Sequence, residues 1–145
     1  MSKYKHILLA LELDSKNDNI LINKAKEMVK QYGAKLSLIH AVEHLSNYGA
    51  AYGVTAGIDL EEELLQEAKK MMGSFAKKND VSDSKQHVLI GPAKHVIIDE
   101  AKECKADLIV VGSHGRHGVR LLLGSTANAI LHSAQCDVLA VRVQE

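Results

Sequence analysis

Apolar residues are arranged along this chain in two alternating patterns. Short, mainly apolar segments lie at 6–13, 36–42, 106–111 and 137–143, and the segment 84–90 ends in Val-Leu-Ile. Such segments are typical of strands that are buried in a parallel sheet. Between them, apolar residues at helical spacing predict helices over 21–32, from 59, from 92 and over 125–133. The alternation predicts one α/β domain over residues 1–145, with a five-stranded, mainly parallel sheet.

Two segments complete this pattern. Residues 43–58 are rich in Gly and Ala and show no clear period. A connection of this length is either a surface loop or a lid over a site, and both interpretations stay open. In the helix after it, one face carries Leu60, Leu64, Ala68, Met71, Met72 and Phe75. We therefore expect the Met71–Met72 pair to pack in the core.

The most informative stretch is 108–128, which reads LIVVGSHGRHGVRLLLGSTAN. A buried strand runs into glycines at Gly112 and Gly115, and Gly124 precedes the start of a helix. Glycines let backbone N–H groups approach a ligand closely, and a helix N-terminus offers unpaired N–H donors with a partial positive charge. The stretch predicts a phosphate-binding loop, most simply for a nucleotide.

Composition limits the partners. The 18 Lys and Arg balance the 18 Asp and Glu, and aromatic residues make up only 3% of the chain. Neither a basic surface nor stacking platforms are available, so we expect no nucleic-acid binding. Cys104 and Cys136 have no CxxC spacing, so reduced thiols are expected. The first apolar run is too short for a signal peptide or a membrane span, which predicts a cytoplasmic protein.

Signals for catalysis are weak. The chain has no GxxxxGK[ST] and no GxGxxG motif, and no carboxylate lies between Gly112 and Thr126 to hold Mg²⁺ or to activate water. His114 and His117 lack the glutamate and the helical setting of a zincin motif, so phosphate contact or exposure is expected of them. We expect ligand binding with slow hydrolysis at most, and predict no catalytic or metal-ligating residue.

With these residues laid out, the chain resembles the universal stress protein family over nearly its whole length. The segments that carry the resemblance, in family order, are KHILLALELDS, LSLIHAV, GPAKHVIIDEAKECKADLIVVGSHG and GSTANAILHSAQCDVLAVRV. The resemblance implies a Rossmann-like sheet of strand order 3-2-1-4-5 with helices on both faces. In that order, the carboxyl ends of strands one and four form the switch point where ligands bind.

Nucleotide-binding members of the family carry Gly, two residues, Gly, nine residues, and then Gly followed by Ser or Thr. Gly112 and Gly115 match the first two positions, and Gly124 and Ser125 match the last two, but the spacer at 116–123 has eight residues. The resemblance implies ribose and phosphate contacts for Gly112 and Gly115. Gly124, Ser125 and Thr126 would supply donors to the phosphates, and Arg116 could add positive charge.

At the end of strand one, the family usually has Asp where this chain has Glu12. A carboxylate there can accept a hydrogen bond from the adenine amino group, although the extra methylene of Glu12 shifts the acceptor. A solvated strand-end acid is the alternative for Glu12. Ala41 matches a position whose backbone meets the adenine edge, whereas His40 is expected to have a structural role.

The resemblance implies an adenine-nucleotide-binding stress-response module that takes ATP or AMP, with Mg²⁺ as part of the nucleotide complex. In the family the last strand joins two subunits, so residues 138–143 imply a homodimer; a strand edge shielded by Arg142 and the C-terminus is the alternative. A nucleotide-free interaction protein is the competing function, because some family branches lack the glycine motif. A weak ATPase is the third.

Overall fold

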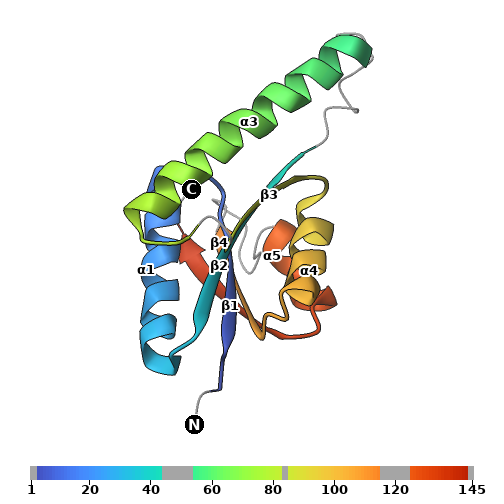
Figure 1. Ribbon diagram of the computed structural model, residues 1–145. Helices are drawn as coiled ribbons and strands as arrows, with labels where there is room; N and C mark the ends of the chain where they lie inside the picture. Colours follow the sequence, from blue (N-terminus) through green and yellow to red (C-terminus); the bar gives the residue numbers. More distant parts are fainter. Residues whose placement is uncertain (1–2, 44–53, 83–84, 115–124, 144–145) are drawn as a thin grey trace.

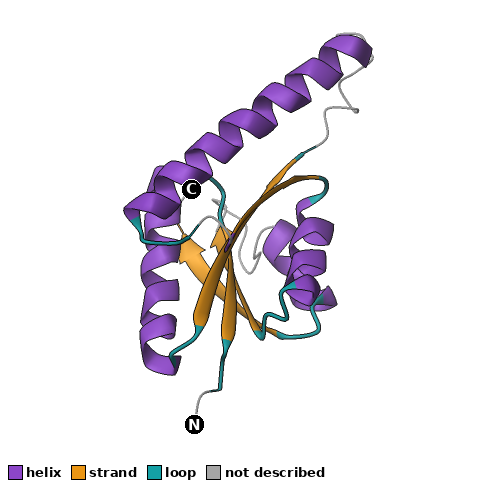
Figure 2. Cartoon of the chain, viewed as in Figure 1, coloured by secondary structure: helices purple, strands orange, loops and turns teal. Residues whose placement is uncertain are grey.

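A computed structural model of the chain describes residues 3–43, 54–82, 85–114 and 125–143. Its strands are β1 (His6–Ala10), β2 (Lys35–Val42), β3 (Gln86–Ile90), β4 (Leu108–His114) and β5 (Asp137–Val143). Its helices are α1 (Ser15–Tyr32), α3 (Val54–Lys78), α4 (Ala93–Glu103) and α5 (Ser125–Ser133). Figure 1 shows these elements along the chain, and Figure 2 shows helices flanking a central sheet.

The five strands form one sheet in the order β3-β2-β1-β4-β5, and every neighbouring pair is parallel. This confirms the expected Rossmann-like α/β fold and its strand order. β1 lies at the centre, where Leu9 is opposite Val110 of β4 and Leu38 of β2. The strand order reverses between β1 and β4, so a crevice is expected at their carboxyl ends.

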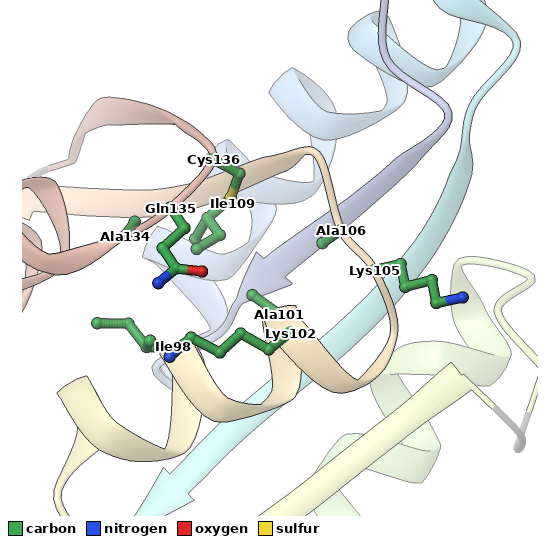
Figure 3. Close-up of a pocket in the computed structure, with 9 residues that line it drawn as sticks. All are labelled: Ile98, Ala101, Lys102, Lys105, Ala106, Ile109, Ala134, Gln135 and Cys136. Atoms are coloured by element: carbon green, nitrogen blue, oxygen red, sulfur yellow. The ribbon is translucent and has the colours of Figure 1, made fainter.

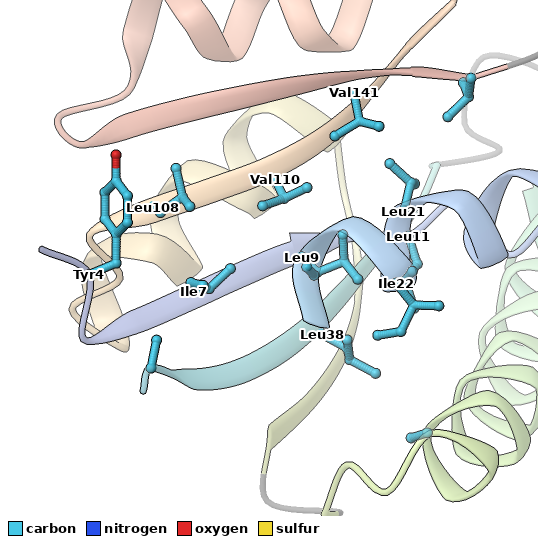
Figure 4. Packing of buried hydrophobic residues seen from close by; sticks show 14 of the residues in the cluster. Tyr4, Ile7, Leu9, Leu11, Leu21, Ile22, Leu38, Leu108, Val110 and Val141 are labelled. Atoms are coloured by element: carbon cyan, nitrogen blue, oxygen red, sulfur yellow. The ribbon is translucent and has the colours of Figure 1, made fainter. Parts of the chain in front are cut away.

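Both faces of the sheet are covered, because successive strand residues point to opposite sides. On one face, buried residues such as Ile7, Leu9 and Val110 pack with Leu21 and Ile22 of α1, as Figure 4 shows. Met72 and Ala76 of α3 belong to the same cluster. On the other face, the buried residues of α4 and α5 cover Leu8, Ile39 and Ile109. This two-sided burial explains why the strands read as mainly apolar segments.

The α3 helix differs from the prediction in two ways. It begins at Val54, so part of the segment expected to be irregular is helical, whereas residues 44–53 lie outside the described part of the chain. Met72 is 1% exposed and belongs to the core, but Met71 is 43% exposed, so only half of the methionine pair packs as expected. Adjacent helical residues point about 100° apart, so both cannot face the sheet. None of the described helices is long and apolar enough to cross a membrane.

β4 is longer than predicted. The expected strand stopped at Val111, but the ladder with β5 continues through Gly112, Ser113 and His114. Val141, Arg142 and Val143 of β5 lie opposite these three residues and keep the strand paired. Gly112 is therefore a strand residue and not part of a turn, because tertiary pairing overrides the weak strand preference of glycine.

The turn between β1 and α1 is fixed by two aspartates. Asp14 caps α1 by accepting a hydrogen bond from the Lys16 amide at 3.1 Å. Asp18, only 2% exposed, accepts one from the Glu12 amide at 3.0 Å. Burial raises the pKa of the Asp18 carboxyl to about 6, and the nearby Glu12 and Asp14 carboxylates act in the same direction.

Replacement of this buried carboxyl should change how stability depends on pH. Because the Asp18 pKa is raised on folding, its contribution to stability is greatest at low pH and is lost as pH rises through about 6. Asp18→Asn retains an oxygen acceptor without the charge. Between pH 4 and pH 7 it should therefore gain about 2–3 kcal/mol in unfolding free energy relative to the parent protein.

Urea unfolding at a series of pH values measures this difference. Asp99→Asn, which removes the same charge from an exposed position on α4, is the matched control and should follow the parent curve. Parallel curves for Asp18→Asn and the parent would show that Asp18 does not titrate differently in the folded protein.

Candidate functional site

The carboxyl ends of β2, β1 and β4 bring three predicted site residues to one row. β1 pairs Ala10 with Ile39, and Leu9 with Val110. The ladders of β1 end at these residues. Glu12, Ala41 and Gly112 each lie two positions beyond Ala10, Ile39 and Val110, which places the three in a row at one edge of the sheet. Hydrogen bonds from the Leu11 amide to the Ile39 carbonyl (2.8 Å) and between His40 Nδ1 and the Leu11 carbonyl (2.7 Å) hold the row together. His40 therefore has the structural role expected of it.

Glu12 lies two residues beyond the end of β1 and is exposed. Its backbone is fixed on one side by Asp18 and on the other by Leu13, which has a φ of 60°. A leucine in this left-handed region costs about 1–2 kcal/mol, so the surrounding contacts must hold the turn in place. The carboxylate is thus presented at the end of the central strand from a rigid turn.

Asn17 adds a buried polar group beside this turn. It is only 4% exposed, and its Oδ1 atom has no hydrogen-bond partner among the described atoms. A buried acceptor without a partner is costly and uncommon in folded proteins.

Gly112 does not have the positive φ that a turn glycine would need. A Cβ atom built on it would lie 3.4 Å from Val143 Cγ2 and 3.7 Å from Leu21 Cδ1, which are ordinary contact distances. Glycine here is therefore not required by backbone conformation or by packing within the described chain. What it leaves open is the approach of another molecule to the backbone.

The helix expected to meet the phosphates begins where predicted, at Ser125. Thr126 is exposed in its first turn, which contains no acidic side chain. Because β4 and β5 are parallel, the connecting helix runs back along the sheet and starts near the carboxyl end of β4 (Figure 1). Its free N–H groups then face the end of the sheet that carries Glu12 and Ala41.

The remaining predicted contacts, Gly115, Arg116 and Gly124, lie outside the described residues. Within the described chain, reasoning from sequence missed Asn17 and Asp18. Both precede Leu21 and Ile22 by three to five positions, so helical periodicity alone places them toward the buried face of α1. Polar residues on an apolar face were the signal that could have found them.

Comparison with known proteins places this geometry in context. The sequence pattern of the Universal stress protein family matches residues 3–142. Universal stress protein A homolog 2 of Coxiella burnetii is 58% identical over 144 residues, which cover 99% of each chain.

Two solved structures share the fold. Universal stress protein UspA of Lactobacillus plantarum superposes with a TM-score of 0.78 at 24% identity, covering 98% of this chain and 100% of the other. A universal stress protein in complex with cAMP superposes with a TM-score of 0.59 at 22% identity, covering 97% and 98%. Because the family pattern and a close relative both span nearly the whole chain, this protein belongs to the universal stress protein family.

Proposed function

We propose that the protein is a cytoplasmic stress-response module that binds an adenine nucleotide, ATP or AMP, at the carboxyl ends of β1 and β4. The observation that carries the proposal is the row formed by Ala41, Glu12 and Gly112, where the strand order reverses. In sequence, the glycine motif runs from Gly112 to the residue before α5, and it would supply backbone N–H groups to the phosphates. The relative solved with cAMP is a family member that holds an adenine nucleotide.

Each part of the nucleotide has a matching group. The Glu12 carboxylate would accept a hydrogen bond from the adenine amino group, with the Ala41 backbone along the base edge. The phosphates would lie against the N–H groups that open α5, from Ser125 and Thr126, with Gly115, Arg116 and Gly124 completing the loop. Mg²⁺ would enter only as part of the nucleotide complex.

Ligand release tests the function directly. Freshly purified protein is heat-denatured, and the supernatant is analysed by anion exchange for ATP and AMP. Nucleotide in near-stoichiometric amount, or uptake of added ATP by calorimetry, is expected. A folded protein that releases no nucleotide and binds neither ATP nor AMP would contradict this proposal and support the nucleotide-free interaction protein.

Gly124→Val should abolish binding, because a branched side chain beside the α5 amides would crowd the phosphates. Calorimetry with ATP measures the change. Gly73→Val is the matched control, since a Cβ built on Gly73 in α3 meets nothing within 4 Å. Gly73→Val should retain the parent affinity. An unchanged affinity in Gly124→Val would contradict a phosphate site at the start of α5.

Glu12→Ala should weaken ATP binding about ten- to a hundredfold, the usual cost of losing one hydrogen bond to a charged group. It should also reduce the preference for ATP over GTP, because guanine presents a carbonyl oxygen where adenine presents an amino group. Competition binding with both nucleotides measures the ratio. If the ratio of ATP affinity to GTP affinity does not change, Glu12 does not recognise the base.

We also propose that β5 joins two copies of the chain. In the sheet, β5 pairs with β4 alone, and Val138, Leu139 and Ala140 are only partly buried. An apolar edge strand with unpaired backbone groups is a surface for strand pairing. A two-fold axis beside β5 would satisfy both copies at once.

Ala140→Lys should therefore convert the dimer to a monomer, as a charge on an edge strand opposes pairing. Light scattering after size exclusion measures the mass. Leu89→Lys places the same charge on β3, the opposite edge strand, where Leu89 is 45% exposed, and should stay dimeric. Equal behaviour of the two variants would contradict dimerisation through β5.

A further inference from the structure

A second hollow lies at the other end of the sheet. It has a volume of ≈ 540 Å³ and lies between the last two turns of α4 and the connection from α5 to β5 (Figure 3). Ala106 precedes β4, and Gln135 and Cys136 precede β5, so the pocket lies at the amino ends of these strands. The proposed nucleotide site lies at their carboxyl ends. A volume of this size is typical of small-molecule sites.

Most of the pocket wall is apolar. Ala101, Ala106, Ile109 and Ala134 contribute methyl and aliphatic groups. The Cys136 thiol also lines it, and burial raises the pKa of that thiol, so it stays neutral at physiological pH. An occupant would therefore bury an apolar body here without meeting a reactive thiolate.

Two polar groups, the Lys102 ammonium and the Gln135 side-chain amide, reach this apolar wall from opposite sides. In Figure 3 the Lys102 side chain extends along α4 past Ile98, and the Gln135 amide extends from the α5–β5 connection toward α4. Neither group has a hydrogen bond or an ion pair within the described ranges. The Lys105 ammonium, by contrast, points away from the other lining residues.

None of the described carboxylates forms an ion pair with Lys102, although Asp107 and Asp137 are close enough to contribute to the raised pKa of Cys136. Asp107 accepts hydrogen bonds from the Lys5 and His6 amides at 2.9–3.1 Å. Asp137 accepts one from the Tyr4 hydroxyl at 2.8 Å, and Glu100 lies 3.4 Å from His87. The C-terminus of α4 carries roughly half a negative charge, less than the full charge of Lys102. The pocket thus combines an apolar wall with a cation that forms no ion pair with the described residues.

From this arrangement we propose that the pocket binds a small amphiphilic anion, with its apolar body against Ala101, Ile109 and Ala134 and its carboxylate at the Lys102 ammonium and the Gln135 amide. The site is separate from the nucleotide site and does not depend on it. Apolar burial supplies most of the affinity, and the anionic head selects the ligand.

Octanoate is the probe, titrated into ¹⁵N-labelled protein and followed by amide chemical shifts. Shifts should concentrate on 101–109 and 134–136, and they should persist with saturating ATP. Lys102→Gln should weaken binding about fivefold, as expected for one exposed ion pair. Lys105→Gln removes the same charge just beyond the end of α4 and should bind like the parent. Octylammonium, with the same chain and the opposite charge, should not produce the shift pattern.

A pocket-filling variant gives an independent result. Ala134→Leu should abolish octanoate shifts while the spectrum elsewhere stays native, because the added side chain occupies the hollow. If this variant unfolds, Ala106→Val provides the same test. Three results would overturn the proposal: equal weakening in Lys102→Gln and Lys105→Gln, shifts that map to other surfaces, or no shifts at millimolar octanoate.

Discussion

The parallel pairing of β1 with β4 is the constraint on which this molecule depends. It joins two halves of the chain that are about a hundred residues apart, and it sets the point at which the order of strands reverses. Both faces of these strands are buried against helices. A shift of the pairing by one residue would turn every side chain of a strand to the opposite face, where it would meet the wrong helices. The register is therefore firmly specified, and it also fixes the position of the turn at the end of each strand.

The turn after β1 is held unusually tightly. The chain passes through a leucine with positive φ, and a buried aspartate on α1 binds the amide of Glu12. Such a turn can persist only where several contacts determine it together. The buried Asn17 oxygen without a described partner lies in the same region. Strain, a buried acid and an unmatched acceptor together are features that accumulate at functional sites, where local stability gives way to ligand recognition.

Much of this architecture could be predicted from sequence because burial on two faces leaves a strong pattern. The helix from Ser125 to Ser133 and the strand from Asp137 to Val143 agree with expectation to the residue. The helix expected over 21–32 ends at Tyr32, and Gly33 caps it with a φ of 67°. The errors occurred where tertiary contacts decide. β5 extends β4 through Gly112, and the position of α3 on the sheet buries Met72 but exposes Met71. Asp18 was missed because a carboxylate is usually taken as a solvent-facing residue, and only its helical phase reveals that it is buried.

β4 has a further consequence for how the protein can respond to its surroundings. The strand is seven residues long, so about 20 Å separate its first and last Cα atoms. One end adjoins the crevice beside Glu12 and the other adjoins the hollow beside Lys102. Molecules bound at these ends could not touch, and neither would displace the other. If both proposed sites are occupied, one domain would hold two ligands at once, with β4 connecting the two sites.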